Sequence, residues 1–379
     1  MALSTTVFRI QLLAFSLITS LLIFQYEPLM SDKGVPISLS LVIFSISQII
    51  IMLATLFWGK AITYVQNGNR LIEISLIIRI IITSIMYFIE QNDLFILLFL
   101  LYHTVSSSID ITFEGMLGRW AYNQNRPFGK FRLFGSIGYA SSGLIASFIY
   151  ALTKQIDFLL LFIMVINIII LVGTILFPLN VQMKNRVKQK KEPIDKKVYL
   201  LILLGALITN LPNSFGVVLN SHYRSTFHLT VEEATFYTGL ALLVGSCISE
   251  VTGFYYVDRL IQRFQAKNII LIGMMLCLIR WLIAIFADSS VMFTATYIFH
   301  GISFALIYLG CVTFVKETHG EESVNKTVIN FSLMAALIGF LFTQLFSVVL
   351  TYYTTGFLLG LFIIISLFVS LLYYYYYWK

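Results

Sequence analysis

Four polar residues recur at helical spacing inside an otherwise apolar stretch, LYHTVSSSIDITFEGML, which spans residues 101–117. They are His103, Ser107, Asp110 and Glu114. Their separations of four, three and four residues place them on one face of a helix. Hydroxyl and imidazole groups in such a stripe can simply bond to neighbouring helices, but packing alone cannot satisfy two carboxylates. We therefore predict functional roles for Asp110 and Glu114.

The two acids are expected to differ in protonation. Charged carboxylates on one helical face repel each other, so one of the pair is expected to hold a proton near neutral pH. An ionisable group at bilayer depth costs at least about 2.5 to 3.5 kcal/mol and usually marks a transport pathway. We predict that Asp110 takes part in proton coupling and that Glu114 binds substrate.

Arg132 is the natural partner of Glu114. It follows Glu114 by eighteen residues across a short basic loop, so antiparallel helices would hold the two side chains at similar depth. A guanidinium and a carboxylate together can bind hydroxyl or carboxylate groups of a solute. Tyr139 lies two helical turns beyond Arg132, where it can stack on a sugar ring or base, or serve as an ordinary core aromatic. Close approach by a neighbouring helix is expected at Gly135, Gly138 and Gly143.

The composition assigns these residues to a membrane protein. Of the 379 residues, 59% are hydrophobic and 11% are charged, whereas a soluble domain is about 25% charged. Apolar runs long enough to span a bilayer predict twelve helices. They cover approximately 10–29, 37–59, 71–89, 94–117, 131–152, 157–178, 198–220, 233–257, 268–287, 291–315, 327–350 and 357–377. Arg79, Arg132 and Arg280 fall inside these spans, as do His103, His300 and the acids Asp110, Glu114 and Glu250.

The basic residues predict the orientation of these spans. With the N-terminus inside, nineteen of the 25 Lys and Arg lie in cytoplasmic segments and three in outer connections, as the positive-inside rule requires. We expect the protein to lie in the plasma membrane, with both termini in the cytoplasm. The net charge of +7 follows from this topology, and charges scattered over short loops do not indicate nucleic acid binding.

The longest polar stretch divides the chain into equal parts. NVQMKNRVKQKKEPIDKK, residues 180–197, is basic and leaves six predicted spans on each side. We therefore predict an all-α protein with an N-terminal six-helix bundle (residues 1–179), a cytoplasmic linker (180–197) and a C-terminal six-helix bundle (198–379). Two pseudo-symmetric bundles of this kind form the major facilitator superfamily fold, in which the halves rock about a central site.

The stretch FGKFRLFGSIGYA, residues 128–140, resembles the fifth-helix motif of lactose permease and its relatives, the oligosaccharide:proton symporters. In that permease the arginine and a glutamate eighteen residues earlier hold the sugar, and an aromatic residue seven positions later stacks on it. The resemblance implies these roles for Arg132, Glu114 and Tyr139. Arg280 and His300, twenty residues apart, are similar to the arginine and histidine of the proton and sugar site.

Two further positions qualify this resemblance. Glu250 approximates the other essential glutamate of the permease, at a spacing to Arg280 that differs by a few residues. The proton-carrying glutamate expected three residues after His300 is replaced by Ser303. The local FHGISFAL resembles phenylpropionate-permease-like and nucleoside-permease-like relatives instead. The resemblance implies a role in proton coupling for Glu250, Arg280 and His300, with His300 also at the substrate. Together with Asp110 from the polar stripe, they form the predicted proton-coupling set.

The expected function is secondary active transport of a small polar organic solute, with protons as coupling ion and a sugar or oligosaccharide favoured. Nucleoside transport, aromatic-acid transport and uncoupled uniport remain alternatives within the transporter class. A membrane-embedded enzyme and a non-transporting sensor are the two other classes of function. The sequence contains no HExxH, GxSxG or nucleotide-binding loop, so we expect neither an enzyme nor a cofactor or metal site. We expect a monomer in the lipid bilayer.

Overall fold

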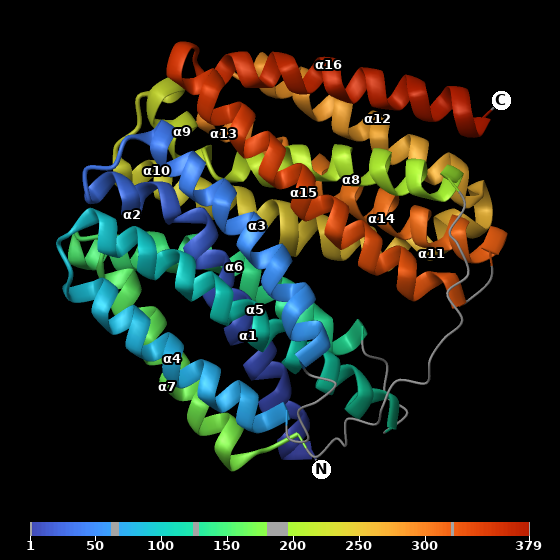
Figure 1. Cartoon of the computed structure of the whole chain (residues 1–379). Helices are drawn as coiled ribbons and strands as arrows, with labels where there is room; N and C mark the ends of the chain where they lie inside the picture. Colours follow the sequence, from blue (N-terminus) through green and yellow to red (C-terminus); the bar gives the residue numbers. More distant parts are fainter. Residues whose placement is uncertain (1, 62–67, 124–128, 180–195, 320–321, 379) are drawn as a thin grey trace. The chain divides into compact units, whose positions relative to one another are not determined.

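The computed structural model describes residues 2–61, 68–123, 129–179, 196–319 and 322–378, and all regular elements in these ranges are helices (Figure 1). Within the helices some side chains lie outside the described part, including those of Asp110, Glu114 and Arg132. The predicted linker falls almost entirely outside the described residues, since 180–195 are not among them. The all-α membrane class predicted from the sequence is confirmed.

The chain groups into two compact units. Unit 1 comprises Met1–Pro36 and Ile46–Lys191, and unit 2 comprises Ile37–Ser45 and Glu192–Lys379. The helices up to the central loop are α1 Ala2–Phe24, α2 Tyr26–Asp32, α3 Ile37–Ala61, α4 Gly68–Phe88, α5 Asn92–Asn123, α6 Gly129–Thr153 and α7 Phe158–Leu176. In unit 1, α1 packs along α6, and α4 packs against both α5 and α7 (Figure 1).

The helices that follow the central loop belong to unit 2. They are α8 Lys196–Gly216, α9 Leu219–Phe227, α10 Val231–Leu242, the π-helix η1 Leu243–Glu250, α11 Val251–Phe264, α12 Ala266–Ile285, α13 Ser290–Ala295, α14 Tyr297–His319, α15 Glu322–Tyr352 and α16 Thr355–Tyr373, followed by a terminal π-helix η2 Tyr374–Trp378. Within this unit α14 packs on η1, α11 and α12, while α8 packs on α15. Helix α14 therefore contacts the helices that carry the other predicted site residues of unit 2.

Eleven helical spans among the described residues are long and apolar enough to cross a membrane. The twelfth predicted span, 94–117, corresponds to α5, a continuous helix of 32 residues. Its described apolar part is Asn92–Ser107. Each predicted span thus coincides with helix.

Three predicted spans are divided by breaks that the sequence prediction missed, and one of them, 291–315, is broken at Thr296 between α13 and α14. The span 10–29 is split at Gln25, where α1 ends and α2 begins. The span 198–220 ends as α8 at Gly216, and α9 follows after two residues. Pro212 lies inside α8 and lacks the N–H that an α-helix requires, so the helix is weakened one turn before it ends. Apolar composition continues across these breaks, which is why hydropathy did not indicate them.

Helix α6 approaches α1 closely through its glycines. A Cβ at Gly138 would meet the carbonyl oxygen of Leu13, and one at Gly135 would lie 3.1 Å from the Ser16 hydroxyl oxygen. The close approach predicted from the glycine spacing is confirmed at these two positions. It fixes the face of α6 that carries Tyr139 relative to α1.

Candidate functional site

The most completely described group of predicted site residues lies in unit 2. Arg280 on α12 is entirely buried, and its guanidinium carbon lies 4.2 Å from the ring centroids of both Trp281 and Tyr297. Beyond Tyr297, no described side chain forms a hydrogen bond or an ion pair with its guanidinium. Contact with the two aromatic rings therefore holds this charge without a carboxylate partner among the described residues.

His300, which belongs to α14, lies beside this arginine. Its ring centroid is 6.0 Å from that of Tyr297, at an interplanar angle of 82°. Its Nδ1 atom is buried and has no hydrogen-bond partner among the described residues. The structure therefore brings Arg280 and His300 together, as expected, and adds Tyr297 between them. Tyr297 could have been suspected from its spacing, since it precedes His300 by three residues on the same helical face.

Glu250 reaches the same region through an unusually close helix contact. It is the last residue of η1, and a Cβ at Gly301 would meet its backbone nitrogen, the carbonyl oxygen of Gly245 and the hydroxyl of Ser249. On the opposite helix, a Cβ at Gly245 would lie 3.3 Å from the His300 ring. Small residues on both helices thus let η1 and α14 touch at backbone distance. The π-helix, a form often found at functional sites, was not predicted.

Ser303 occupies the position where the resemblance implies a proton-carrying acid. Its hydroxyl donates to the carbonyl oxygen of His300, at 2.8 Å. The side chain is buried and satisfied within its own helix. It offers no ionisable group, so a proton at this position would need another carrier.

The predicted residues of unit 1 are described less completely. His103 and Ser107 are buried on α5, and the Ser107 hydroxyl donates to the carbonyl oxygen of Thr104, at 2.9 Å. This bond within the helix agrees with a structural role for the serine. The side chains of Asp110, Glu114 and Arg132 lie outside the described part. Their helices are placed, and the clamp between them stays a prediction.

Tyr139 is described and packs against α1. Its ring meets the edge of Phe24 at a centroid distance of 5.4 Å and an interplanar angle of 85°. Its carbonyl oxygen accepts a hydrogen bond from the Ser20 hydroxyl, at 3.1 Å. The ring is half-buried, so one part serves in packing and the remainder can meet a solute.

Two buried polar groups of unit 1 received no role from the sequence. Arg79 on α4 is entirely buried and donates through Nη2 to the hydroxyl of Tyr102 on α5. Gln25 is also entirely buried at the break between α1 and α2, and both atoms of its amide lack hydrogen-bond partners among the described residues. The signal was present for each, since both are polar residues inside apolar runs.

An ion pair ties together two connections at one end of unit 1. Lys33 Nζ lies 2.8 Å from Asp157 Oδ2, which joins the residue after α2 to the start of α7. Burial, and then the charge of Asp157, raise the pKa of the neighbouring Asp32 above its usual value, against the opposing effect of Lys33. These groups lie outside the apolar spans and fix a connection rather than a binding site.

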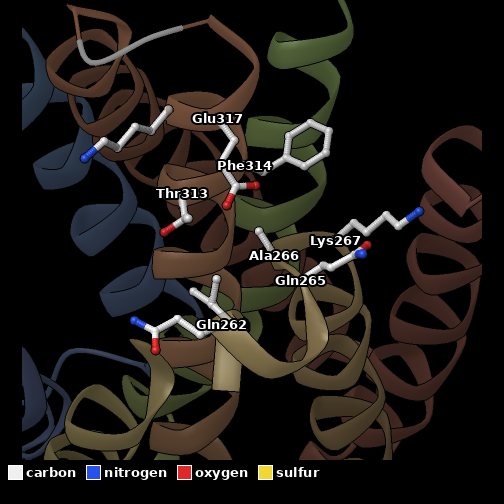
Figure 2. Close-up of a pocket in the computed structure, with 9 residues that line it drawn as sticks. Gln262, Gln265, Ala266, Lys267, Thr313, Phe314 and Glu317 are labelled. Carbon is white, nitrogen blue, oxygen red and sulfur yellow. The ribbon is translucent and has the colours of Figure 1, made fainter. Parts of the chain in front are cut away.

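A pocket of about 760 Å³ opens at the junction of α11, α12 and α14 (Figure 2). Side chains from all three helices line it, among them Gln262 of α11, Ala266 of α12 and Glu317 of α14 (Figure 2). None of the predicted site residues lines this pocket. Among the described residues, no group of three His, Cys, Asp or Glu side chains is placed to hold a metal ion.

Comparison with known proteins identifies the family of the chain. The profile of the MFS_1 like family matches residues 8–325. An uncharacterized transporter, YwbF, of Bacillus subtilis (strain 168) is 23% identical over 279 residues, which cover 73% of this chain and 68% of that protein. Maltose permease of Geobacillus stearothermophilus is 24% identical over 314 residues, which cover 80% of this chain and 76% of that protein.

Solved structures share the fold at low sequence identity. The nucleoside transporter NupG superposes with a TM-score of 0.77 at 12% identity, covering 98% of each chain. The POT family transporter PepTSo has a TM-score of 0.79 at 9% identity and covers 98% of this chain and 97% of its own. At such low sequence identity, the structural similarity shows the fold and does not show which solute is transported. The chain belongs to the MFS_1 like family, and it is a multi-pass membrane transporter of the major facilitator type.

Proposed function

We propose that this transporter carries a sugar or oligosaccharide together with protons, by alternating access, across the plasma membrane with both termini in the cytoplasm. The observation that carries the proposal is the group formed by the buried Arg280 and Tyr297 and the half-buried His300, against the backbone of Glu250. The similarity to a protein named maltose permease supports a sugar as cargo. A buried cation beside an imidazole, with the backbone of an acidic residue in contact, is an arrangement that can respond to protonation.

The two units are assigned different tasks. In unit 1, Glu114 and Arg132 grip hydroxyl groups of the solute and Tyr139 contacts its flat face. In unit 2, His300 contributes to solute binding, while Glu250 and Arg280 couple it to the proton. Since Ser303 cannot carry the proton, Glu250 or Asp110 takes that role. The protein then needs no cofactor, and the gradient supplies the energy.

The binding assignment is tested by a thermal-shift screen of the purified protein with maltose, uridine and phenylpropionate, which represent the three cargo classes. We expect maltose to stabilise the protein and Glu114→Ala to abolish that stabilisation. The cargo assignment is wrong if uridine or phenylpropionate stabilises the protein and maltose does not. Unchanged affinity for the stabilising solute in Glu114→Ala would remove the grip assignment.

The coupling assignment is tested by proton uptake. Proteoliposomes in weakly buffered medium are given the stabilising solute without any gradient, and external pH is recorded. We expect the medium to become more alkaline in the wild type and to stay unchanged in the Glu250→Gln, Asp110→Asn double variant. Coupling through these acids is refuted if the double variant takes up protons at the wild-type ratio.

Uncoupled uniport is the second candidate, and Ser303 favours it. A hydroxyl bonded to its own helix replaces the ionisable side chain at this position, and a carrier without a proton acceptor there can work by diffusion down the solute gradient. Solute entry into the same proteoliposomes without any pH change would identify this mode.

A further inference from the structure

Unit 1 contains a buried cationic group that the proposed function does not use. The guanidinium carbon of Arg79 lies 4.8 Å from the ring centroid of Tyr102, and Nη2 donates to the hydroxyl of the same tyrosine. Arg79 is entirely buried and His103 is 4% exposed. We call Arg79, Tyr102 and His103 the unit-1 arginine cluster.

This cluster has the same composition and ring geometry as the group in unit 2. The rings of Tyr102 and His103 are 6.0 Å apart at 86°, and those of Tyr297 and His300 are 6.0 Å apart at 82°. In both units the arginine comes from one helix, α4 or α12, and the tyrosine and histidine come from the next long helix, α5 or α14. The chemistry therefore repeats between the units although the sequence spacing differs.

The donors of the unit-1 arginine cluster are incompletely used. Among the described residues Arg79 Nε and Nη1 and His103 Nε2 are buried without a hydrogen-bond partner. Lys33 is paired with Asp157, whereas no carboxylate in the described part of the chain forms such a pair with Arg79. A buried guanidinium with unfilled donors is costly unless an anion reaches it.

The surroundings select the kind of anion. His103 packs on Phe99 at a centroid distance of 4.5 Å, and Phe99 in turn packs on Tyr26 at 4.5 Å. Aromatic walls favour a flat, singly charged group over a strongly hydrated phosphate. A guanidinium fork matches the two oxygens of a carboxylate. We propose that the unit-1 arginine cluster is a second binding site, specific for the carboxylate of a small organic anion.

Benzoate and benzamide form a matched pair of probes, because they share the ring and differ in charge. Binding is measured by isothermal titration calorimetry on the full chain in nanodiscs of a neutral lipid, with no pH or solute gradient. The Arg280→Gln variant provides the background, since it removes the equivalent cluster of unit 2. We expect this variant to bind one benzoate saturably and to bind benzamide at least about tenfold more weakly.

Adding Arg79→Gln to this background is expected to weaken benzoate binding at least about tenfold. The proposal is overturned if the background variant does not bind benzoate more tightly than benzamide, or if Arg79→Gln leaves benzoate binding unchanged. Should Arg79→Gln fail to give a monodisperse protein, Arg79→Lys keeps the charge and removes the fork, with the same expected loss and the same refuting result. Because no transport is measured, the outcome is independent of proton coupling and of the sugar assignment.

Discussion

Arg280 shows how one residue can be both unfavourable and useful in a membrane protein. Its guanidinium is held between two aromatic rings and has no carboxylate partner among the described residues. A residue that served packing alone would be replaced by an apolar side chain at a gain in stability. The same reasoning applies to Arg79, which the sequence placed inside a span without assigning it a partner.

Replacing Arg280 by lysine tests whether the planar group is needed. Lysine keeps the charge but cannot stack or present a fork of donors. We expect Arg280→Lys to lower pH-driven solute uptake at least about tenfold while exchange of solute across the membrane without a gradient continues. Equal losses in both assays would assign Arg280 to solute binding instead of coupling.

Tyr139 is expected to act through its ring and not through its hydroxyl. Tyr139→Phe keeps the edge contact with Phe24 and the stacking face, so solute affinity is expected to change less than about twofold. Tyr139→Ala is expected to weaken affinity about tenfold. Both affinities are measured by calorimetry with the solute found in the thermal-shift screen. A full loss in Tyr139→Phe would show that the hydroxyl makes the contact.

At the scale of the helices, the contact between η1 and α14 positions Glu250 beside His300. The two helices approach so closely because Gly245 and Gly301 lack side chains at the crossing. The backbone of Glu250 is thereby fixed next to the residue that follows His300. Any change in this packing is expected to alter both stability and coupling.

A methyl group at Gly301 tests this contact. Its Cβ would meet the carbonyl oxygen of Gly245, and overpacking of this kind costs about 1 to 3 kcal/mol. We expect Gly301→Ala to lower the Tm of the detergent-solubilised protein. Gly360→Ala is the matched control, because a Cβ there meets nothing within 4 Å and alanine favours the helix. Equal Tm values for the two variants would contradict the close contact.

Helix α9 adds an acid-sensitive element outside the apolar spans. Burial lowers the pKa of His222 to about 4, and its Nδ1 lies 2.8 Å from the Thr355 hydroxyl at the start of α16. The folded state keeps this imidazole neutral, whereas in the unfolded chain it gains a proton below its ordinary pKa of 6.5. The stabilisation is thus complete above pH 6.5 and is lost as pH falls toward 4, by at most about 3 kcal/mol.

We expect the Tm of the wild type to fall between about pH 7 and pH 4.5, and the fall to be smaller in His222→Gln. The comparison of the two pH profiles removes the contribution of other titrating groups. Parallel profiles would show that His222 does not control acid stability. Thr355→Val, which removes the hydroxyl partner alone, is expected to lower Tm at both pH values.

The helical elements were largely predictable and their interruptions were not. Spans follow from apolar length, which any helix in a bilayer must satisfy. The break at Gln25 and the π-helix η1 leave composition unchanged and depend on what packs against them. The unit-2 site was partly predictable because Arg280 and His300 are ionisable in apolar runs. The partnership of Arg79 with Tyr102 was not, since it joins two helices at no characteristic spacing.

At the scale of the whole molecule, each of the two units contains an arginine, a tyrosine and a histidine in similar contact. This repetition is a likeness between the units that comparison of their residues along the sequence did not show. The distribution of basic residues predicts an orientation in the membrane with both termini in the cytoplasm. A cysteine-free variant carrying Lys154→Cys is expected to react with an impermeant maleimide in intact cells, and one carrying Lys316→Cys only after permeabilisation. The reverse labelling pattern would show that the chain has the opposite orientation in the membrane.

The central claim is that a proton gradient drives solute transport, and solute accumulation tests it most directly. Proteoliposomes with an alkaline interior and no ATP are given the radiolabelled solute from the thermal-shift screen. We predict accumulation above the external concentration that a protonophore abolishes and that the Glu250→Gln, Asp110→Asn double variant lacks. Equilibration to the external concentration, unaffected by the gradient or the protonophore, would contradict the claim.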